Sequence, residues 1–537
     1  MKHKALIAAM SLCCSFPLHA SNNEQLQREI QRLQAQTQAL QQQLNQLQKQ
    51  LVSEDSTPAP KARPSKQAKV TTKAEVVRET APNGKPKPVP REGSTFHTSA
   101  VTVHSIDSHP DSMAFYPTAL VADEHVVTYI AGTPVVTSPY LGSRPSFDGS
   151  DYIVNISSIN RDIRLMQQRR RLYRAYESIG YPAPKMPIIA ISGKLEPIAT
   201  LSRNYADVTK GDLNLGSSEL DIAAALNKMV EGYMSIAYDD SPPIDFGQRA
   251  ANSNLFLNMG FINIGNLDQT PFYFTAGQLF VPYGRFSSAM ISSPLTLQLA
   301  RTRQRPFILG YKSQGETGPF AAVYGFKADT TKGGQGSGGL NLGYVFGDGD
   351  TTGEIGASVI STLNDATGMQ DTDGSGSNFG GFASPTNGNE EVKKIPGVGV
   401  HGNISFDRYN LTAEWVGATT AFRPQDLSFN GRGAKPQAAQ VEAGMTFMAF
   451  TKPASVALGY QWAKDTLALN IPQQRISGVF NISIWKDTIE SLEYRHDIDY
   501  GSSTYANGAA PPGVVNTNTL GTGKSADTLL AQIGVYF

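Results

Sequence analysis

Three arginines spaced two residues apart, Arg301, Arg303 and Arg305, are the residues of this chain best suited to bind an anion. A period of two places side chains on one face of a strand. Guanidinium groups bind carboxylates and phosphates through charge-assisted, often bidentate, hydrogen bonds. If the face points into a pore, the row would attract a polyanionic solute. If it points outward above a membrane, it would bind lipopolysaccharide phosphates, and the sequence pattern leaves both interpretations open.

No other pattern predicts chemistry, so we expect no catalytic residue, no metal site, no cofactor and no enzymatic activity. Residues 521–525 imitate the end of a phosphate-binding loop. However, Asn518 stands where that motif needs a glycine, and a predicted strand follows where a helix should begin. Cys13 and Cys14 are the 2 cysteines of the chain and lie in a predicted signal peptide, so the mature protein should have no disulfide.

The elements that must position the arginines are predicted to be strands of an outer-membrane barrel. Leu529, Ala531, Ile533 and Val535 share one face of a terminal strand, and Phe537 closes the chain as the expected barrel C-terminal signal. The fold class is therefore an all-β transmembrane barrel of about 16 antiparallel strands, with an N-terminal α-helical coiled coil. The strands are expected at 188–197, 218–226, 230–238, 254–264, 271–281, 305–312, 319–327, 339–346, 353–361, 397–406, 409–417, 439–449, 454–463, 475–485, 488–496 and 529–537.

The connections between these strands alternate in length. Those after even-numbered strands are mostly short and those after odd-numbered strands mostly long, as periplasmic turns and external loops are in a barrel with both termini in the periplasm. The long loops near 282–304, 362–396, 418–438 and 497–528 are candidates for a constriction or an external binding surface. A barrel of this size is wide enough for an aqueous channel unless loops or a plug fill it.

Four segments precede the barrel at 188–537. Residues 1–20 read as a signal peptide, with a lipoprotein signal as the rival interpretation. Residues 21–51 carry a heptad repeat that predicts a periplasmic coiled coil, with a solvated single helix as the alternative and a homotrimer as the expected assembly. Thr37 interrupts the apolar seam, whose oligomerisation residues are Leu26, Ile30, Leu33, Leu40, Leu44, Leu47 and Leu51.

Residues 52–94 are rich in proline and lysine and are expected to form a disordered tether. Residues 95–187 are expected to form a pre-barrel periplasmic or plug-like segment with a basic helix at 160–178. That helix either belongs to a periplasmic cap whose arginines pair with barrel acids or offers a basic surface to an anionic solute. Lys+Arg and Asp+Glu both number 46, so bulk charge identifies no partner. We expect outer-membrane lipid, lipopolysaccharide and the barrel-assembly machinery as partners, and no nucleic acid.

Two stretches, 133–160 and 276–285, resemble the corresponding regions of the LbtU family of siderophore porins. The first includes Thr-Pro-Val-Val-Thr-Ser-Pro-Tyr-Leu-Gly at 133–142, and the second is Ala-Gly-Gln-Leu-Phe-Val-Pro-Tyr-Gly-Arg. The resemblance implies an outer-membrane receptor that takes up a ferric siderophore, of polycarboxylate type, or iron. It supplies no ligand residues, so the candidate substrate-binding residues are Arg285 and the arginine row at 301, 303 and 305.

The pre-barrel segment is short for the globular plug of a TonB-dependent receptor. A gated or facilitated route without TonB coupling is therefore expected. Two alternatives stay open from the sequence: a general or other-solute porin, and a structural outer-membrane anchor that uses the coiled coil and tether.

Overall fold

The computed structural model divides the chain into two units, Met1–Glu75 and Val76–Phe537. The predicted signal peptide and coiled coil lie outside the described residues and remain predictions. The structure describes residues 77–80, 86–89, 126–130, 133–137, 159–178, 186–239, 254–315, 317–328, 336–348, 351–370, 393–424, 426–485, 488–507 and 520–537.

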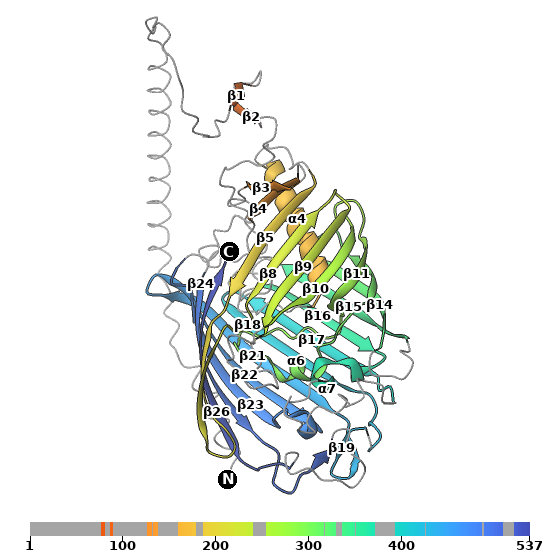
Figure 1. The fold of residues 1–537 in the computed structure, drawn as a ribbon, viewed down its shortest axis with the longest axis vertical. Coiled ribbons are helices and arrows are strands. Elements are labelled where there is room, and N and C mark those ends of the chain that lie inside the picture. The colour runs from red at the N-terminus through yellow and green to blue at the C-terminus, as the bar shows by residue number, and fades with distance from the viewer. Residues whose placement is uncertain are drawn as a thin grey trace, which may run out of the picture. The chain divides into compact units, whose positions relative to one another are not determined.

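The second unit contains a closed antiparallel barrel (Figure 1). The barrel has 16 strands, which confirms the barrel part of the predicted fold class. Three of these strands are built from two consecutive elements each: β5 (Ile188–Leu195) with β6 (Ile198–Arg203), β7 (Thr209–Asn214) with β8 (Glu219–Ala225), and β12 (Arg303–Gln304) with β13 (Phe307–Lys312). The others are β9 (Val230–Asp239), β10 (Asn254–Gly265), β11 (Phe272–Phe280), β14 (Gly318–Lys327), β15 (Gly336–Asp348), β16 (Thr351–Ile360), β17 (Gly397–Phe406), β18 (Tyr409–Ala418), β21 (Gln437–Ala449), β22 (Lys452–Lys464), β23 (Gln474–Ile482), β24 (Thr488–Ile498) and β26 (Ser525–Tyr536).

The barrel closes where β26 pairs with β5 and β6. The backbones of Gly193 and Phe537 exchange two hydrogen bonds at this seam, of 2.6 and 2.9 Å. The start of β5 runs past the end of β26 and pairs there in parallel with β4 (Thr133–Thr137). Strand β4 forms a hairpin with β3 (Val126–Ile130), so part of the pre-barrel segment extends the barrel sheet.

The outer surface of the barrel is apolar. Along β26, Leu529, Ile533 and Val535 are 43, 50 and 38 % exposed, whereas Leu530 between them is 6 % exposed. Similar exposed leucine, isoleucine, valine and aromatic side chains recur on most barrel strands. Exposed apolar side chains that alternate with buried ones around a closed sheet are the lipid-facing belt of a membrane barrel.

The first hairpin differs from its prediction. The strands expected at 188–197 and 218–226 continue as β6 and β7, so their connection is a turn at 204–208 and not a long loop. The sequence signal was weak here because β7 is almost entirely exposed and lacks apolar alternation. A second difference lies in the expected tether, where β1 (Val77–Thr80) pairs with β2 (Pro86–Val89). The sequence between them contains Asn83-Gly84, a dipeptide favoured in hairpin turns.

Apart from the turn at 204–208, which lies at the end with the long loops, short connections and long connections lie at opposite ends of the barrel strands, as predicted. The short end holds residues 407–408 and 450–451 and the C-terminus, whereas 281–302, 361–396 and 499–524 belong to the long end. The long connections contain the short elements α6 (Leu295–Ala300), η1 (Leu363–Asp365), α7 (Thr367–Gln370), β19 (Ser428–Phe429), β20 (Arg432–Gly433), η2 (Leu467–Leu469) and β25 (Ala506–Asn507). Among the described helices, none is long and apolar enough to cross a bilayer.

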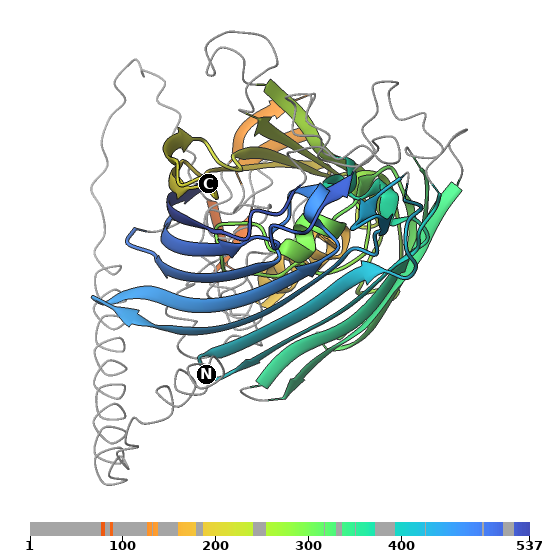
Figure 2. The same ribbon diagram turned by 90° about the horizontal axis from the view of Figure 1, so that it is seen from below.

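Helix α4 (Arg161–Ser178) lies inside the barrel (Figures 1 and 2). Ile163 and Met166 belong to one buried cluster with Phe261 of β10 and Tyr273 of β11, which point inward. The core of the protein therefore fills part of the lumen instead of lying between two layers. The predicted basic helix is an internal element of the barrel.

Candidate functional site

A long connection enters the lumen from β11. Residues 281–302, which we call the lumen loop, include α6 and correspond to the loop predicted at 282–304 as a candidate constriction. Its side chains Tyr283, Leu295 and Leu299 are fully buried. Helix α6 contacts β18, β21 and β22. These strands stand on the far side of the barrel from β11, so the loop crosses the lumen (Figure 2).

Carboxylates of the far wall hold the lumen loop by its backbone. Glu414 accepts the N–H groups of Arg285 and Phe286 at 2.6 and 2.9 Å. Further along the loop, the Ala289 N–H donates to Glu442 at 2.6 Å, and the Ser292 N–H donates to Glu493 at 2.9 Å. The Leu295 N–H donates to the side-chain oxygen of Gln461 at 2.7 Å. Charged acceptors make stronger hydrogen bonds than neutral ones. The wall acids thus serve to fix the loop.

Arg285 lies in the lumen, at the start of this loop. Its Nε is 3.3 Å from Oε1 of Glu354 on β16. The same carboxylate oxygen is 3.2 Å from Nε2 of His401 on β17. Arg285 is therefore the candidate arginine that the structure places on an internal surface, in an ion pair with the wall.

Helix α4 is tied to the opposite wall. Arg169 forms an ion pair with Glu231 of β9 at 2.9 Å and donates to the carbonyl of Gly265 at 2.9 Å. Thr275 of β11 donates to the Asp162 carboxylate at 3.0 Å. These contacts agree with the expected pairing of the basic helix with barrel acids, but the helix lies inside the lumen and not in a periplasmic cap.

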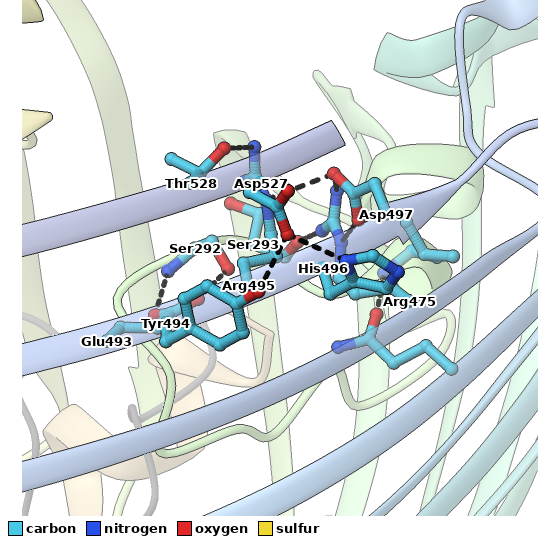
Figure 3. Close-up of polar contacts among 12 residues, drawn as sticks. Ser292, Ser293, Arg475, Glu493, Tyr494, Arg495, His496, Asp497, Asp527 and Thr528 are labelled. Carbon is cyan, nitrogen blue, oxygen red and sulfur yellow. Dashed lines mark hydrogen bonds and ion pairs between the residues drawn. The ribbon is translucent and has the colours of Figure 1, made fainter. Parts of the chain in front are cut away.

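A polar cluster joins the lumen loop to β23 and β24 (Figure 3). Arg475 donates to both carboxylate oxygens of Asp497, at 2.6 and 3.3 Å, and to the carbonyl of Ser293 at 3.0 Å. Nε of Arg495 is 3.1 Å from the same carboxylate. Two guanidinium groups thus share Asp497, and the Arg495 side chain retains 23 % exposure. Its second contact is to Thr528 on β26 at 3.3 Å.

Sequence reasoning did not select Glu414, Glu442, Glu493, Arg475 or Arg495. Each lies within a predicted strand at an inward position, beside an outward apolar residue such as Val441 or Ile476. The sequence does show these charged residues at inward positions of predicted strands. It does not show which of them contact the lumen loop.

The external loops predicted at 418–438 and 497–528 pack on each other. Strand β19 pairs with both β20 and β25, so the two loops form a small sheet. Arg432 donates to both oxygens of Asp465 at 2.8 and 3.0 Å and ties this sheet to the next loop.

Burial raises the pKa of Tyr500 to about 12, so its hydroxyl keeps its proton and donates to the Ala463 carbonyl at 3.2 Å. The long end of the barrel therefore carries an ordered loop surface.

Comparison with known proteins identifies the family. No family model matches the chain. A UPF0422 protein of Legionella pneumophila (strain Paris) is 62 % identical over 544 residues, which cover 100 % of both chains. A UPF0422 protein of Coxiella burnetii is 37 % identical over 405 residues, 74 % of this chain and 83 % of the relative. The chain belongs to the UPF0422 family.

Two solved structures resemble this UPF0422 chain at low sequence identity. The anion-selective porin from Comamonas acidovorans has a TM-score of 0.42 and 10 % identity, covering 65 % of this chain and 99 % of the porin. The outer-membrane channel DcaP of Acinetobacter baumannii has a TM-score of 0.42 and 14 % identity, covering 65 % and 97 %. The strand order and closed pairing of the UPF0422 chain itself define its fold.

The predicted arginine row of this UPF0422 chain is separate from Arg285. Arg303 and Arg305 are exposed, and alternation places them on the face of Phe307 and Leu309, both 66 % exposed. Arg301 follows α6 and stacks on the Phe280 ring, with its guanidinium carbon 4.6 Å from the ring centre. The structure thus does not bring the four candidate arginines into one site.

Proposed function

We propose that this protein takes up a ferric siderophore, of polycarboxylate type, or iron across the bacterial outer membrane. The closed barrel with an apolar exterior is the architecture of a transmembrane channel or transport protein. The observation that carries the proposal is the lumen loop, which crosses the barrel and is held by wall carboxylates. Iron and siderophore enter through the resemblance to the LbtU family, with the barrel in the outer membrane and the N-terminal region in the periplasm.

Guanidinium groups supply the chemistry for an anionic solute. Arg285 and Arg495 face the lumen from the loop and from β24, each beside one wall carboxylate. A polycarboxylate complex can exchange with such a carboxylate, because both present the same oxygen pair to the guanidinium fork. These arginines thus replace the row at 301–305 as the favoured contacts on the solute path.

Helix α4 is the proposed moving part. The helix is held by the wall around β11, and the lumen loop crosses the same lumen to the far wall, so a bulky ferric complex needs one of them to shift. The loop is fixed along its backbone by several carboxylates, whereas α4 is held through side-chain contacts such as Arg169 with Glu231. Displacement of α4 without TonB coupling would give the gated route expected from the sequence.

Uptake of radiolabelled ferric siderophore by iron-starved cells tests the proposal. Cells lacking the protein should lose saturable uptake, and the intact gene should restore it at equal surface abundance. Arg285→Gln and Arg495→Gln should each lower the restored uptake, whereas Arg408→Gln in a short turn should not. Unchanged uptake in the deletion would overturn the siderophore proposal.

Two further measurements distinguish the alternatives. In planar bilayers, a general porin would conduct many small ions and show no preference for the ferric complex. A structural anchor would lose its role when 26–51 is deleted, whereas transport should survive that deletion if the predicted coiled coil only forms oligomers.

A further inference from the structure

Arg303 and Arg305 form a basic pair on the outward face of the barrel. They alternate with Gln304, which is 8 % exposed, and the opposite face continues through the buried Pro306 to Ile308, at 1 %. Phe307 and Leu309 continue the arginine face and are exposed. Residues of a barrel strand on the face of exposed apolar side chains point toward lipid. The pair therefore faces the membrane side of the wall and not the solute path.

The pair lies at one border of the apolar belt. Strand β12 follows the lumen loop, so Arg303 and Arg305 belong to the end of the barrel with long loops. Further along the strand, toward the short turns, the outward face is aromatic. Phe307 stacks with Phe274 at 6.2 Å, and Tyr311 contacts Phe272 edge-on at 5.4 Å. Charged residues beside an aromatic girdle mark the level of lipid headgroups.

Neighbouring side chains orient both guanidinium groups. Arg303 donates to the Asn258 amide oxygen at 3.0 Å and lies over the Phe256 ring at 5.3 Å. Arg305 donates to the Gln278 amide oxygen at 3.3 Å. These contacts fix the direction of each guanidinium group along the outer surface. A guanidinium group has five N–H donors in a planar fork, a geometry that suits a phosphate.

We propose that Arg303 and Arg305 bind the phosphate groups of lipid A in the outer leaflet. An anion that meets an outward side chain at headgroup level is a lipid phosphate, and the outer leaflet at the long-loop end carries lipopolysaccharide. Arginine suits this ligand because its planar fork binds phosphate bidentately. This site is independent of the proposed transport function, since it lies on the other face of the wall.

Binding of defined lipids to the purified full-length protein in detergent tests the site. The probes are lipid A with both phosphates, dephosphorylated lipid A and phosphatidylglycerol. Arg303→Gln/Arg305→Gln should bind phosphorylated lipid A about 10-fold more weakly than the wild type, because about 1.4 kcal/mol corresponds to a factor of ten. The matched control is Arg408→Gln, whose side chain is 42 % exposed at the short-turn end.

The expected pattern is tight binding of phosphorylated lipid A alone, lost in the double variant and kept in the control. Equal lipid A binding by the double variant and the wild type would overturn the proposal. Equal binding of phosphatidylglycerol would also overturn it, because the site would then be a general phosphate site. Heat-modifiable migration on gels checks that each variant has a folded barrel.

Discussion

The Glu442 carboxylate accepts the backbone N–H of Ala289 at 2.6 Å and the hydroxyl of Ser288 at 2.7 Å, across 153 and 154 residues of sequence. Loop backbone inside a barrel has N–H groups that need acceptors, because an unpaired buried N–H is costly. Glu442 supplies the acceptor from β21, and Glu414 and Glu493 do the same at neighbouring turns of the loop. The inward acids of the wall thus fix the position of the lumen loop.

Glu442→Ala should loosen the lumen loop. The variant loses acceptors whose hydrogen bonds contribute about 1.5–3 kcal/mol each when the acceptor is charged. Single-channel recordings in planar bilayers should show larger and noisier conductance. Glu442→Gln keeps one acceptor oxygen and should behave more like the wild type.

Glu490→Ala is the matched control for this experiment. Glu490 also accepts a backbone N–H, from Ile484 at 2.9 Å, but at a short turn and outside the lumen. The conductance of Glu490→Ala should equal that of the wild type. If Glu442→Ala also conducts like the wild type, the lumen loop does not limit the pore.

A disulfide between α4 and the wall should block uptake. Asp162→Cys/Thr275→Cys replaces two side chains whose oxygens are 3.0 Å apart, and the chain has no cysteine after Cys14 to interfere. Oxidised cells should take up ferric siderophore at least tenfold more slowly, and a reductant should restore the rate. The control Leu201→Cys/Leu529→Cys joins two paired outward residues of the wall. Fast uptake through the oxidised first pair would exclude movement of α4.

Arg495→Gln should make the pore less selective for anions. The variant removes one of two guanidinium groups beside Asp497, so the local charge becomes less positive. The reversal potential across a bilayer with a salt gradient should move toward that of a cation-selective pore. Arg203→Gln, on the outer surface with a side chain 58 % exposed, should leave it unchanged. High salt should reduce the difference by screening.

Asp465→Ala should open the external loops to protease. The Asp465 side chain is 1 % exposed and holds Arg432 and the N–H of Lys435. Trypsin added to intact cells should cleave the variant near 432–435 faster than the wild type. Asp407→Ala, in a short turn at the opposite barrel end, should give no new cleavage in intact cells. Cleavage at 408 in intact cells would reverse the assigned orientation.

Tyr500→Phe should remove a pH-dependent part of the stability of the external loops. The folded-state pKa of about 12 lies above the ordinary tyrosine value of about 10. The hydroxyl therefore stabilises the fold fully below pH about 10, and that contribution is lost as the pH rises through about 12. Below pH 10 the free energy of unfolding of the variant should be lower by roughly 1 kcal/mol, so the variant should unfold at a lower temperature. The difference should shrink toward pH 12, as circular dichroism can show.

Local patterns were sufficient to predict the barrel. Alternation in β26, with Leu529 and Ile533 outward, follows from the two-residue period of a strand and needs no distant partner. The same holds for the short turns, where polar pairs such as Asp407-Arg408 interrupt that period. Where alternation failed, as in β7, the prediction failed too.

The sequence by itself determined the transmembrane barrel, its strand order and the position of its long loops, because these follow from side-chain period and spacing along neighbouring residues. Only the tertiary structure decided which polar groups meet inside. Ala289 and Glu442 are 153 residues apart, and Asp162 and Thr275 are 113 apart, so each pair forms only when the barrel closes. Closure also separates lumen from lipid, which placed Arg285 inside and Arg305 outside although both are arginines near one loop.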